Sequence, residues 1–167
     1  MSATPQQSHY QRACQQAVER VLEALEAYTS DTLAKQFTRL FYESVTLDDL
    51  QDMPPELAAA IAAHVFHHYQ HHDPEADPEG EGCAIHIDMP DFIKTHFHRG
   101  RLALTIISRD MPFLIDSTTI CLKQLGFHTY RTIHPQLRVR RDADGALRAL
   151  APAAEAEVRR ESCMYFE

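Results

Sequence analysis

The chain has 167 residues, a mass of 19.1 kDa and a formal net charge of −8. Its 44% hydrophobic and 24% charged residues are ordinary for a globular protein. No apolar run approaches the roughly 20 residues of a membrane-spanning helix, and the acidic balance argues against a nucleic-acid binder. The polar N-terminus and the four widely spaced cysteines argue against a secretory signal and a disulfide framework. We therefore expect a cytoplasmic protein.

Charge and composition divide the chain into two parts. Residues 1–82 contain four Lys or Arg and fourteen Asp or Glu, whereas residues 83–167 contain twelve and ten. The stretch 73–82 has two prolines, two glycines and five acidic residues, which is typical of a linker. The division predicts a helical unit over 1–72, an acidic linker over 73–82 and a second unit over 83–167.

Apolar residues recur at helical spacing through the first part of the chain. The predicted helices run over 8–29, from Ser30 or Asp31 to Ser44, and over 54–72, with a capped turn at 46–50. A serine or aspartate at the start of the second helix suits the N-cap, and prolines suit the first turn of the third. The first unit is therefore an antiparallel helical hairpin or a three-helix unit.

The apolar spacing changes to that of strands beyond the linker. The pattern predicts strands at 83–87, 102–108, 130–141, 146–150 and 162–167, and a well-buried helix at 113–125, and it leaves 91–100 undecided. The central strand–helix–strand–strand order is half of a ferredoxin-like unit. The fold class is therefore α+β, with an N-terminal helical unit followed by a partial ferredoxin-like antiparallel sheet and one packed helix.

The partial unit lacks a second helix and a fourth strand. The strand 102–108 would then have an open edge, since the fourth strand of such a sheet pairs with the first. We expect this edge to be covered by the strand 83–87, by the N-terminal helices or by a second copy of the chain. Because the chain stops inside an apolar strand, we also expect it to be a fragment of a longer polypeptide.

The turn between the strand 102–108 and the following helix has the sequence Asp110-Met111-Pro112-Phe113-Leu114. It resembles the first strand–helix junction of ACT domains, the small ligand-binding modules of amino-acid metabolism, whose usual form is Asp-x-Pro-Gly-hydrophobic. Asp110 and Pro112 match this form, whereas Phe113 stands in the place of the glycine. The resemblance implies an ACT-like sheet, but a side chain at position 113 would obstruct a ligand that approaches the backbone there.

Four further runs stand out in the sequence: Asp110–Ser117, Ile133–Asp142, Phe41-Tyr42 and Glu161-Ser162. These runs are similar to the N-terminal region of the large bacterial NAD-specific glutamate dehydrogenases. The resemblance implies a parent enzyme that uses NAD to convert L-glutamate to 2-oxoglutarate and ammonium. The five glycines form no G-x-G-x-x-G loop. We therefore expect no cofactor and no catalysis in this fragment, and a role in regulation or assembly.

The strand–helix junction has two interpretations. Free backbone N–H groups at a helix N-terminus attract anions, so the residues there could bind the carboxylate of an amino-acid effector. The candidate effector-binding residues are Asp110, Met111, Pro112, Phe113 and Asp116. Alternatively, Asp110 caps the helix and Phe113 fills the core, which we favour because helix caps are commoner than ligand sites.

Five histidines gather near the end of the third predicted helix. His64, His68 and His72 follow one another at i, i+4 spacing, which places them on one helix face and makes them candidate metal ligands. The sequence indicates no partner ligand from a second segment, so we favour a solvated polar face over a physiological metal site. His67 and His71 share the same spacing on another face.

A cluster of basic residues lies on the predicted strand 130–141. Arg131, Arg138, Arg140 and Arg141 could bind an acidic partner or a phosphate. We favour intramolecular pairing with the acidic first part of the chain, although each exposed pair would stabilise the fold little.

The expected partners are the remainder of a parent polypeptide, further copies of the chain in a homo-oligomer, and an amino-acid effector. We expect neither nucleic acid nor a membrane as a partner. Two alternatives stay open: a ligand-free oligomerisation domain, and a free-standing amino-acid-binding module.

Overall fold

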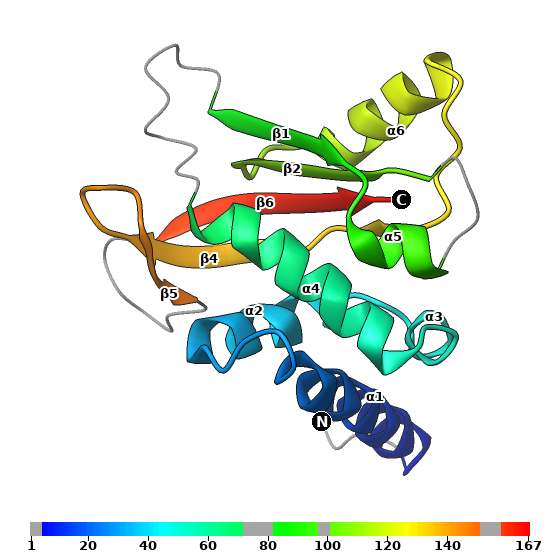
Figure 1. Cartoon of the computed structure of the whole chain (residues 1–167). Coiled ribbons are helices and arrows are strands. Elements are labelled where there is room, and N and C mark those ends of the chain that lie inside the picture. Colours follow the sequence, from blue (N-terminus) through cyan, green and yellow to red (C-terminus); the bar gives the residue numbers. More distant parts are fainter. Residues whose placement is uncertain (1–4, 72–81, 97–100, 151–157) are drawn as a thin grey trace.

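The computed structural model describes residues 5–71, 82–96, 101–150 and 158–167, and these form an α+β fold (Figure 1). Its helices are α1 (Pro5–Leu25), α2 (Thr32–Tyr42), α3 (Leu47–Gln51), α4 (Pro55–Gln70), α5 (Asp91–His96) and α6 (Leu114–Gln124). Its strands are β1 (Cys83–Asp88), β2 (Ala103–Arg109), β3 (Thr132–Ile133), β4 (Gln136–Arg141), β5 (Leu147–Leu150) and β6 (Arg159–Phe166). Apart from Gly82, the predicted linker lies outside the described residues.

The six strands form one antiparallel sheet in the order β1-β2-β6-β4-β5, and β3 pairs with β6 beyond the start of β4. In ferredoxin-like terms β2, β4 and β6 are the first three strands, because β6 lies between the other two as the third strand of such a unit does. β1 occupies the place of the fourth strand beside β2, with Cys83 opposite Ser108 and Asp88 opposite Ala103. Of the three coverings expected for this edge, the structure shows the strand 83–87.

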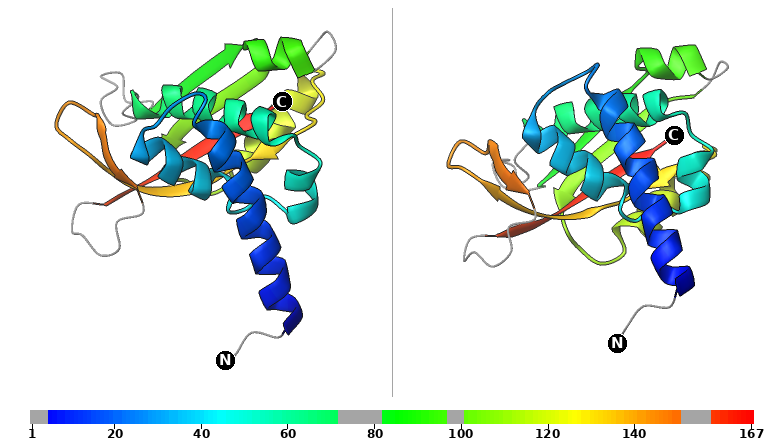
Figure 2. Two further views of the ribbon diagram at one scale, coloured as in Figure 1. Left: turned by 60° about the horizontal axis from the view of Figure 1, so that its bottom comes forward. Right: turned by 90° about the horizontal axis from the view of Figure 1, so that it is seen from below.

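Two of the N-terminal helices, α2 and α3, begin at residues whose side chains satisfy free backbone N–H groups. Asp31 caps α2, since its Oδ1 accepts the N–H of Leu33 at 2.8 Å. Thr46 caps α3 in the same way through the N–H of Asp49 at 3.2 Å. These caps define where the chain turns, so that α1, α2 and α4 pack on one another (Figure 2).

Alternation along the strands gives the sheet two different apolar faces. One face packs against the N-terminal helices in a core that includes Phe37, Ile61, Ile107 and Tyr165. The other face is smaller and carries α6 over Ile106, Met164 and Phe166. The fold therefore has three layers: the N-terminal helices, the sheet and α6 (Figure 1). Because the larger core draws on both compositional parts, the helices and the sheet support each other.

The prediction of a well-buried helix at 113–125 is wrong. α6 has no fully buried residue, and its Ile120 and Cys121 are exposed, as is Leu125 just after its end. Only the side with Leu114, Ile115 and Leu122 packs on the sheet. The other apolar side chains of α6 stay exposed, because no second helix packs beside α6 on this face among the described residues.

Two further segments differ from the sequence interpretation. The predicted strand 130–141 is interrupted at His134-Pro135, because proline has no N–H for the ladder, and so splits into β3 and β4. The undecided segment 91–100 contains α5, whose first turn uses the carbonyl of Pro90 as acceptor for Ile93 and Lys94.

A buried ion pair within the sheet is bonded to the helical layer through Tyr69 of α4. Nε and Nη2 of Arg141 on β4 each donate to a different oxygen of Glu161 on β6 at 2.9 Å. The hydroxyl of Tyr69 on α4 donates to Glu161 at 2.6 Å, and burial raises the pKa of Tyr69, so the hydroxyl keeps its proton. Nη2 of Arg141 also donates to the carbonyl of Tyr69, and Nη1 to that of Gly145, both at 3.0 Å.

The expectation that the arginines pair with the acidic first part is wrong for the two pairs that the structure shows. Arg141 pairs with Glu161, and Arg131 pairs with the buried Glu167 at 2.6 Å. All four residues belong to the second part of the chain. Arg141 also reaches the helical layer, since it donates to the carbonyl of Tyr69 and its guanidinium lies 5.0 Å from the centre of the Tyr69 ring.

We predict that Arg141→Leu lowers the free energy of unfolding by about 3–5 kcal/mol, since it leaves the Glu161 carboxylate buried without its partner. Urea unfolding followed by circular dichroism measures this loss. Arg148→Leu is the matched control, because its pair with Asp142 is exposed and should contribute less than about 1 kcal/mol. Equal losses in the two variants would contradict the prediction.

Candidate functional site

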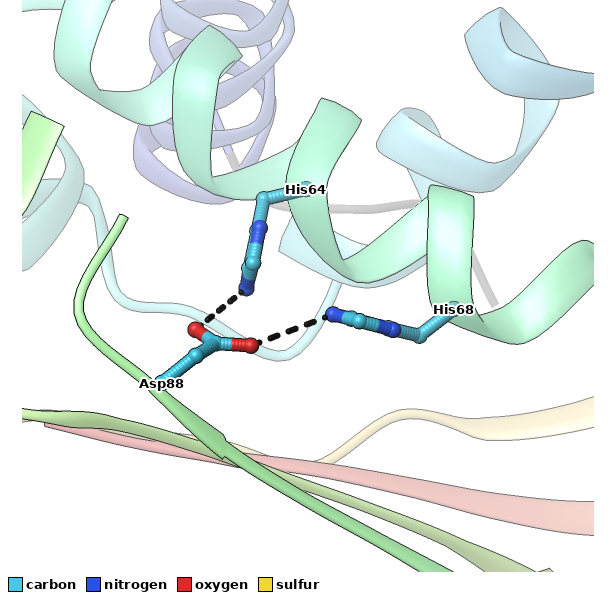
Figure 3. A group of neighbouring side chains, drawn as sticks. All are labelled: His64, His68 and Asp88. Carbon is cyan, nitrogen blue, oxygen red and sulfur yellow. Dashed lines mark ion pairs between the residues drawn. The ribbon is translucent and has the colours of Figure 1, made fainter. Parts of the chain in front are cut away.

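Two histidines of α4 and an aspartate of β1 converge between the helix and the sheet (Figure 3). Nε2 of His64 lies 3.0 Å from Oδ1 of Asp88, and Nε2 of His68 lies 3.3 Å from Oδ2. The two histidine side chains are only 19% exposed and that of Asp88 is 35% exposed. One donor atom from each residue can be chosen so that all three lie within 4.8 Å of one another.

Local geometry explains this convergence. His64 and His68 are one helical turn apart, so both point from α4 toward the sheet. Along β1, His86 and Asp88 alternate with Ile85 and Ile87, so the polar pair faces α4 and the isoleucines face the other side. The ring of His86 stacks on that of His68, with centroids 4.0 Å apart.

The electrostatics of the cluster favour neutral imidazoles. Burial lowers the pKa of His64, and the carboxylate of Asp88 opposes this shift only in part. Burial also lowers the pKa of His68, and the neighbouring His86 and His64 lower it further, again against Asp88. A neutral imidazole is the form that coordinates a metal ion. At neutral pH the cluster therefore offers two nitrogen lone pairs and one carboxylate.

Several polar atoms of the cluster have no hydrogen bond within the described part of the chain. They are Nε2 of His64, His68 and His86, Oδ1 of Asp88, and Oγ1 of Thr105 on the neighbouring strand. The two contacts of Asp88 are thus close without the alignment of a hydrogen bond. Buried polar groups are normally satisfied, so this concentration sets the α4–β1 interface apart from the rest of the fold.

The sequence interpretation of the histidines needs correction. The structure provides the second-segment partner that seemed to be missing, since Asp88 faces both His64 and His68. The alternation His86-x-Asp88 at the start of the strand region was the available signal. His72 lies outside the described residues, and His67 and His71 are held 5.6 Å apart, ring to ring, away from Asp88.

The strand–helix junction is an exposed surface turn. Met111, Pro112, Phe113 and Asp116 are exposed, and Asp110 is partly buried. The favoured interpretation that Asp110 caps α6 is wrong. Oδ1 of Asp110 instead accepts a hydrogen bond from the side-chain amide of Gln136 at 3.1 Å. Its own N–H donates to the carbonyl of Arg160, which joins the junction to β6. The assignment of these five residues as effector ligands stays a prediction.

Phe113 has the left-handed backbone conformation, with φ of 66°. This is the conformation that glycine adopts without strain, so the backbone requirement of the junction remains although the glycine is replaced. The Phe113 ring is 75% exposed, and the expectation that it fills the core is wrong. The left-handed residue starts α6 without a side-chain cap.

The sequence interpretation missed an apolar pocket on the α6 side of the sheet. Ile87, Leu102, Phe127 and Tyr130 are exposed around it, while Leu104, Leu122 and Phe166 form apolar parts of its wall. The guanidinium of Arg101 stacks 4.0 Å from the centre of the Tyr130 ring at one side. The alternation of Ile85 and Ile87 with polar residues was the signal for this second apolar face.

Comparison with known proteins shows the family to which this fold belongs. The family model of the glutamate dehydrogenase ACT1 domain matches residues 37–167. The chain belongs to the glutamate dehydrogenase ACT1 domain family. The NAD-specific glutamate dehydrogenase of Pseudomonas aeruginosa is 31% identical over 85 residues. That match covers 50% of this chain but only 5% of the relative, so the chain corresponds to a small part of that enzyme.

The ACT1 family match covers the segments whose residues resemble ACT domains and glutamate dehydrogenases in the sequence. The match includes the junction at Asp110–Phe113 and the whole sheet, together with α3, α4 and the part of α2 from Phe37 onward. No solved structure matches the chain. Within the described segments, no helix has both the length and the apolar character needed to span a bilayer.

We predict that Phe113→Gly is more stable than Phe113→Ala by about 1 kcal/mol, because alanine keeps the left-handed strain and glycine relieves it. Little burial is lost in either variant, since the ring is exposed. Thermal and urea unfolding of the two variants measure the difference. Equal stabilities would show that the backbone at position 113 is not strained.

We also predict that His134 makes the protein less stable in mild acid. Burial lowers the pKa of His134 despite the nearby Asp110, and its Nε2 lies 2.8 Å from Oγ of Ser162. The unfolded chain then binds more protons than the native one as pH falls through about 6.5, so stability decreases there and is retained above it. His64 and His68 act with the same sign.

Urea unfolding at pH 7.5 and 5.5 isolates this contribution when it is measured for the wild-type chain and for His134→Gln. The variant should lose less stability between the two pH values than the wild type. An equal loss would contradict the assignment.

Proposed function

We propose that this chain is a regulatory and assembly segment of an NAD-dependent glutamate dehydrogenase, and that hydride transfer from L-glutamate to NAD takes place elsewhere in the parent enzyme. The ACT1 family match and the relative from Pseudomonas aeruginosa support this parentage. The small share of that relative covered by the chain leaves room for the catalytic part. We further propose that the segment acts through a docking surface on the α6 side of its sheet.

The single observation that carries the docking proposal is the uncovered apolar side of β1. Ile85 and Ile87 are 62% and 66% exposed, although they pair with the covered Ile106 and Leu104 on the same face of the sheet. The apolar pocket beside Ile87 continues this surface toward Phe127 and Tyr130. Contiguous apolar surface of this kind marks interaction sites in soluble proteins.

The fold accounts for the position of this surface. A ferredoxin-like unit places two helices side by side on one face of its sheet, and the described chain places only α6 there. The uncovered strand β1 lies where the fourth strand of such a unit would lie, beside the strands that α6 covers. Burying the exposed part of each isoleucine would contribute about 1–2 kcal/mol.

We assign this docking surface to another segment of the same parent polypeptide. A covalently connected segment is present at high effective concentration, so a modest apolar area is enough to hold it. The length of the relative supports an intramolecular occupant, since roughly nineteen-twentieths of it lies outside the match. A second copy of the chain is the competing occupant, and the experiment below distinguishes the two.

We predict that Ile87→Lys weakens the parent enzyme but leaves the isolated chain unchanged. In the isolated chain Ile87 is mostly exposed, so the stability should change by less than about 0.5 kcal/mol. In the full-length enzyme a lysine on a buried contact should lower the thermal midpoint and accelerate limited proteolysis near this segment. Tyr28→Lys is the control, because Tyr28 is exposed on the helical side of the molecule.

Two outcomes would change this assignment. If the isolated chain forms a dimer that Ile87→Lys dissociates, the occupant is a second copy. If Ile87→Lys and Tyr28→Lys both leave the full-length enzyme unaltered, the surface is not a docking site.

A further inference from the structure

We propose that His64, His68 and Asp88 bind a divalent transition-metal ion of the zinc class, which clamps β1 to α4. The three side chains come from two elements that are separated in the sequence by the linker, and they converge at their donor atoms (Figure 3). Two imidazoles and a carboxylate form a donor set that suits Zn²⁺. The inference concerns a different face of β1 from the docking surface and stands without it.

The distances fit a shared ion. Ligand atoms bound to tetrahedral zinc at about 2.0–2.2 Å lie roughly 3.3–3.6 Å from one another. The observed separations of Asp88 oxygens from His64 and His68 are 3.0 and 3.3 Å. Small side-chain rotations within the 4.8 Å cluster would therefore bring the donors to coordinating positions.

Simple pairing of the histidines with Asp88 explains the cluster less well. Two imidazole N–H groups that donated to one carboxylate would be aligned with its oxygens. Instead, both Nε2 atoms and Oδ1 of Asp88 are poorly aligned for hydrogen bonds within the described residues, despite the short separations. A cation between the three donors would satisfy all of them at once.

The surroundings hold the donors in place. The ring of His86 stacks on that of His68 at 4.0 Å, and the ring of Phe92 on α5 contacts that of His64 edge-on at 5.5 Å. These contacts restrict rotation of the two imidazoles and shield one side of the cluster from water. His86 is thus a positioning residue, and solvent would complete the coordination of the ion.

The role of the ion follows from the elements that it would join. β1 lies at the edge of the sheet and pairs with β2 alone among the described strands. A metal bridge from Asp88 to α4 would fix this edge strand to the helical layer. An ion bound only by the native fold raises its stability, so the effect is structural and has a readout that does not depend on enzyme activity.

The test uses the purified 167-residue chain, stripped of metal with a chelator, and Zn²⁺ as the probe. Isothermal titration should show one tight equivalent, and Zn²⁺ should raise the thermal midpoint. His64→Gln, His68→Gln and Asp88→Asn should each weaken binding at least tenfold. His67→Gln/His71→Gln is the matched control, since it removes the other histidine pair of α4 and should leave the tight site intact.

Two results would overturn the proposal. The first is binding that is lost in His67→Gln/His71→Gln and unchanged in Asp88→Asn, which would identify adventitious binding by the exposed histidines. The second comes from Co²⁺ substituted into the wild-type chain, which needs no variant to fold. An intense tetrahedral visible spectrum supports a site held by protein ligands, and the weak spectrum of octahedral, mainly water-bound Co²⁺ contradicts it.

Discussion

The buried pair between Arg141 and Glu161 is the constraint on which the arrangement of the layers depends. A charge removed from water needs its full set of partners. For Arg141 these are Glu161 on β6, the carbonyl of Tyr69 at the end of α4, and that of Gly145 in the β4–β5 turn. Moving any of these elements would leave a charged or polar group unsatisfied. The apolar core supplies most of the stability, and we infer that this network fixes the orientation of α4 on the sheet.

The two faces of the sheet then have different roles. The face against the N-terminal helices is closed by aromatic packing, such as Phe41 against Tyr165 at 6.4 Å between ring centres. The opposite face carries a single helix and leaves β1 and its neighbouring pocket open. β1 belongs to both environments, because its alternate residues point to the histidines of α4 on one side and to the uncovered surface on the other. β1 therefore joins the histidine cluster on one face of the sheet to the uncovered apolar surface on the other.

Local patterns in the sequence predicted most elements of the fold, and long-range pairing accounts for most of the errors. The cap of α2 was narrowed to Ser30 or Asp31, and the apolar stripe of α4 was identified, because caps and helical spacing are encoded within a few residues. The helix 113–125 was expected to be buried because its composition is apolar, but composition does not reveal whether a second helix covers the same face. Asp88 was missed as a partner of His64 and His68 because the pairing of β1 with β2 brings it beneath α4 across the linker. Likewise, only the fold shows that Phe113 has a left-handed backbone.

The position of β6 has a consequence for how the chain is made. β6 follows β2 and β4 in the sequence, yet it lies between them in the sheet and bonds to both. During synthesis, β2 and β4 leave the ribosome before the strand that joins them, so each presents an unpaired edge for that interval. Tyr165 and Glu161, which complete the core and the ion pair, arrive at the same late stage. In nascent chains the edges of β2 and β4 are therefore open to pairing with other strands until β6 is inserted between them.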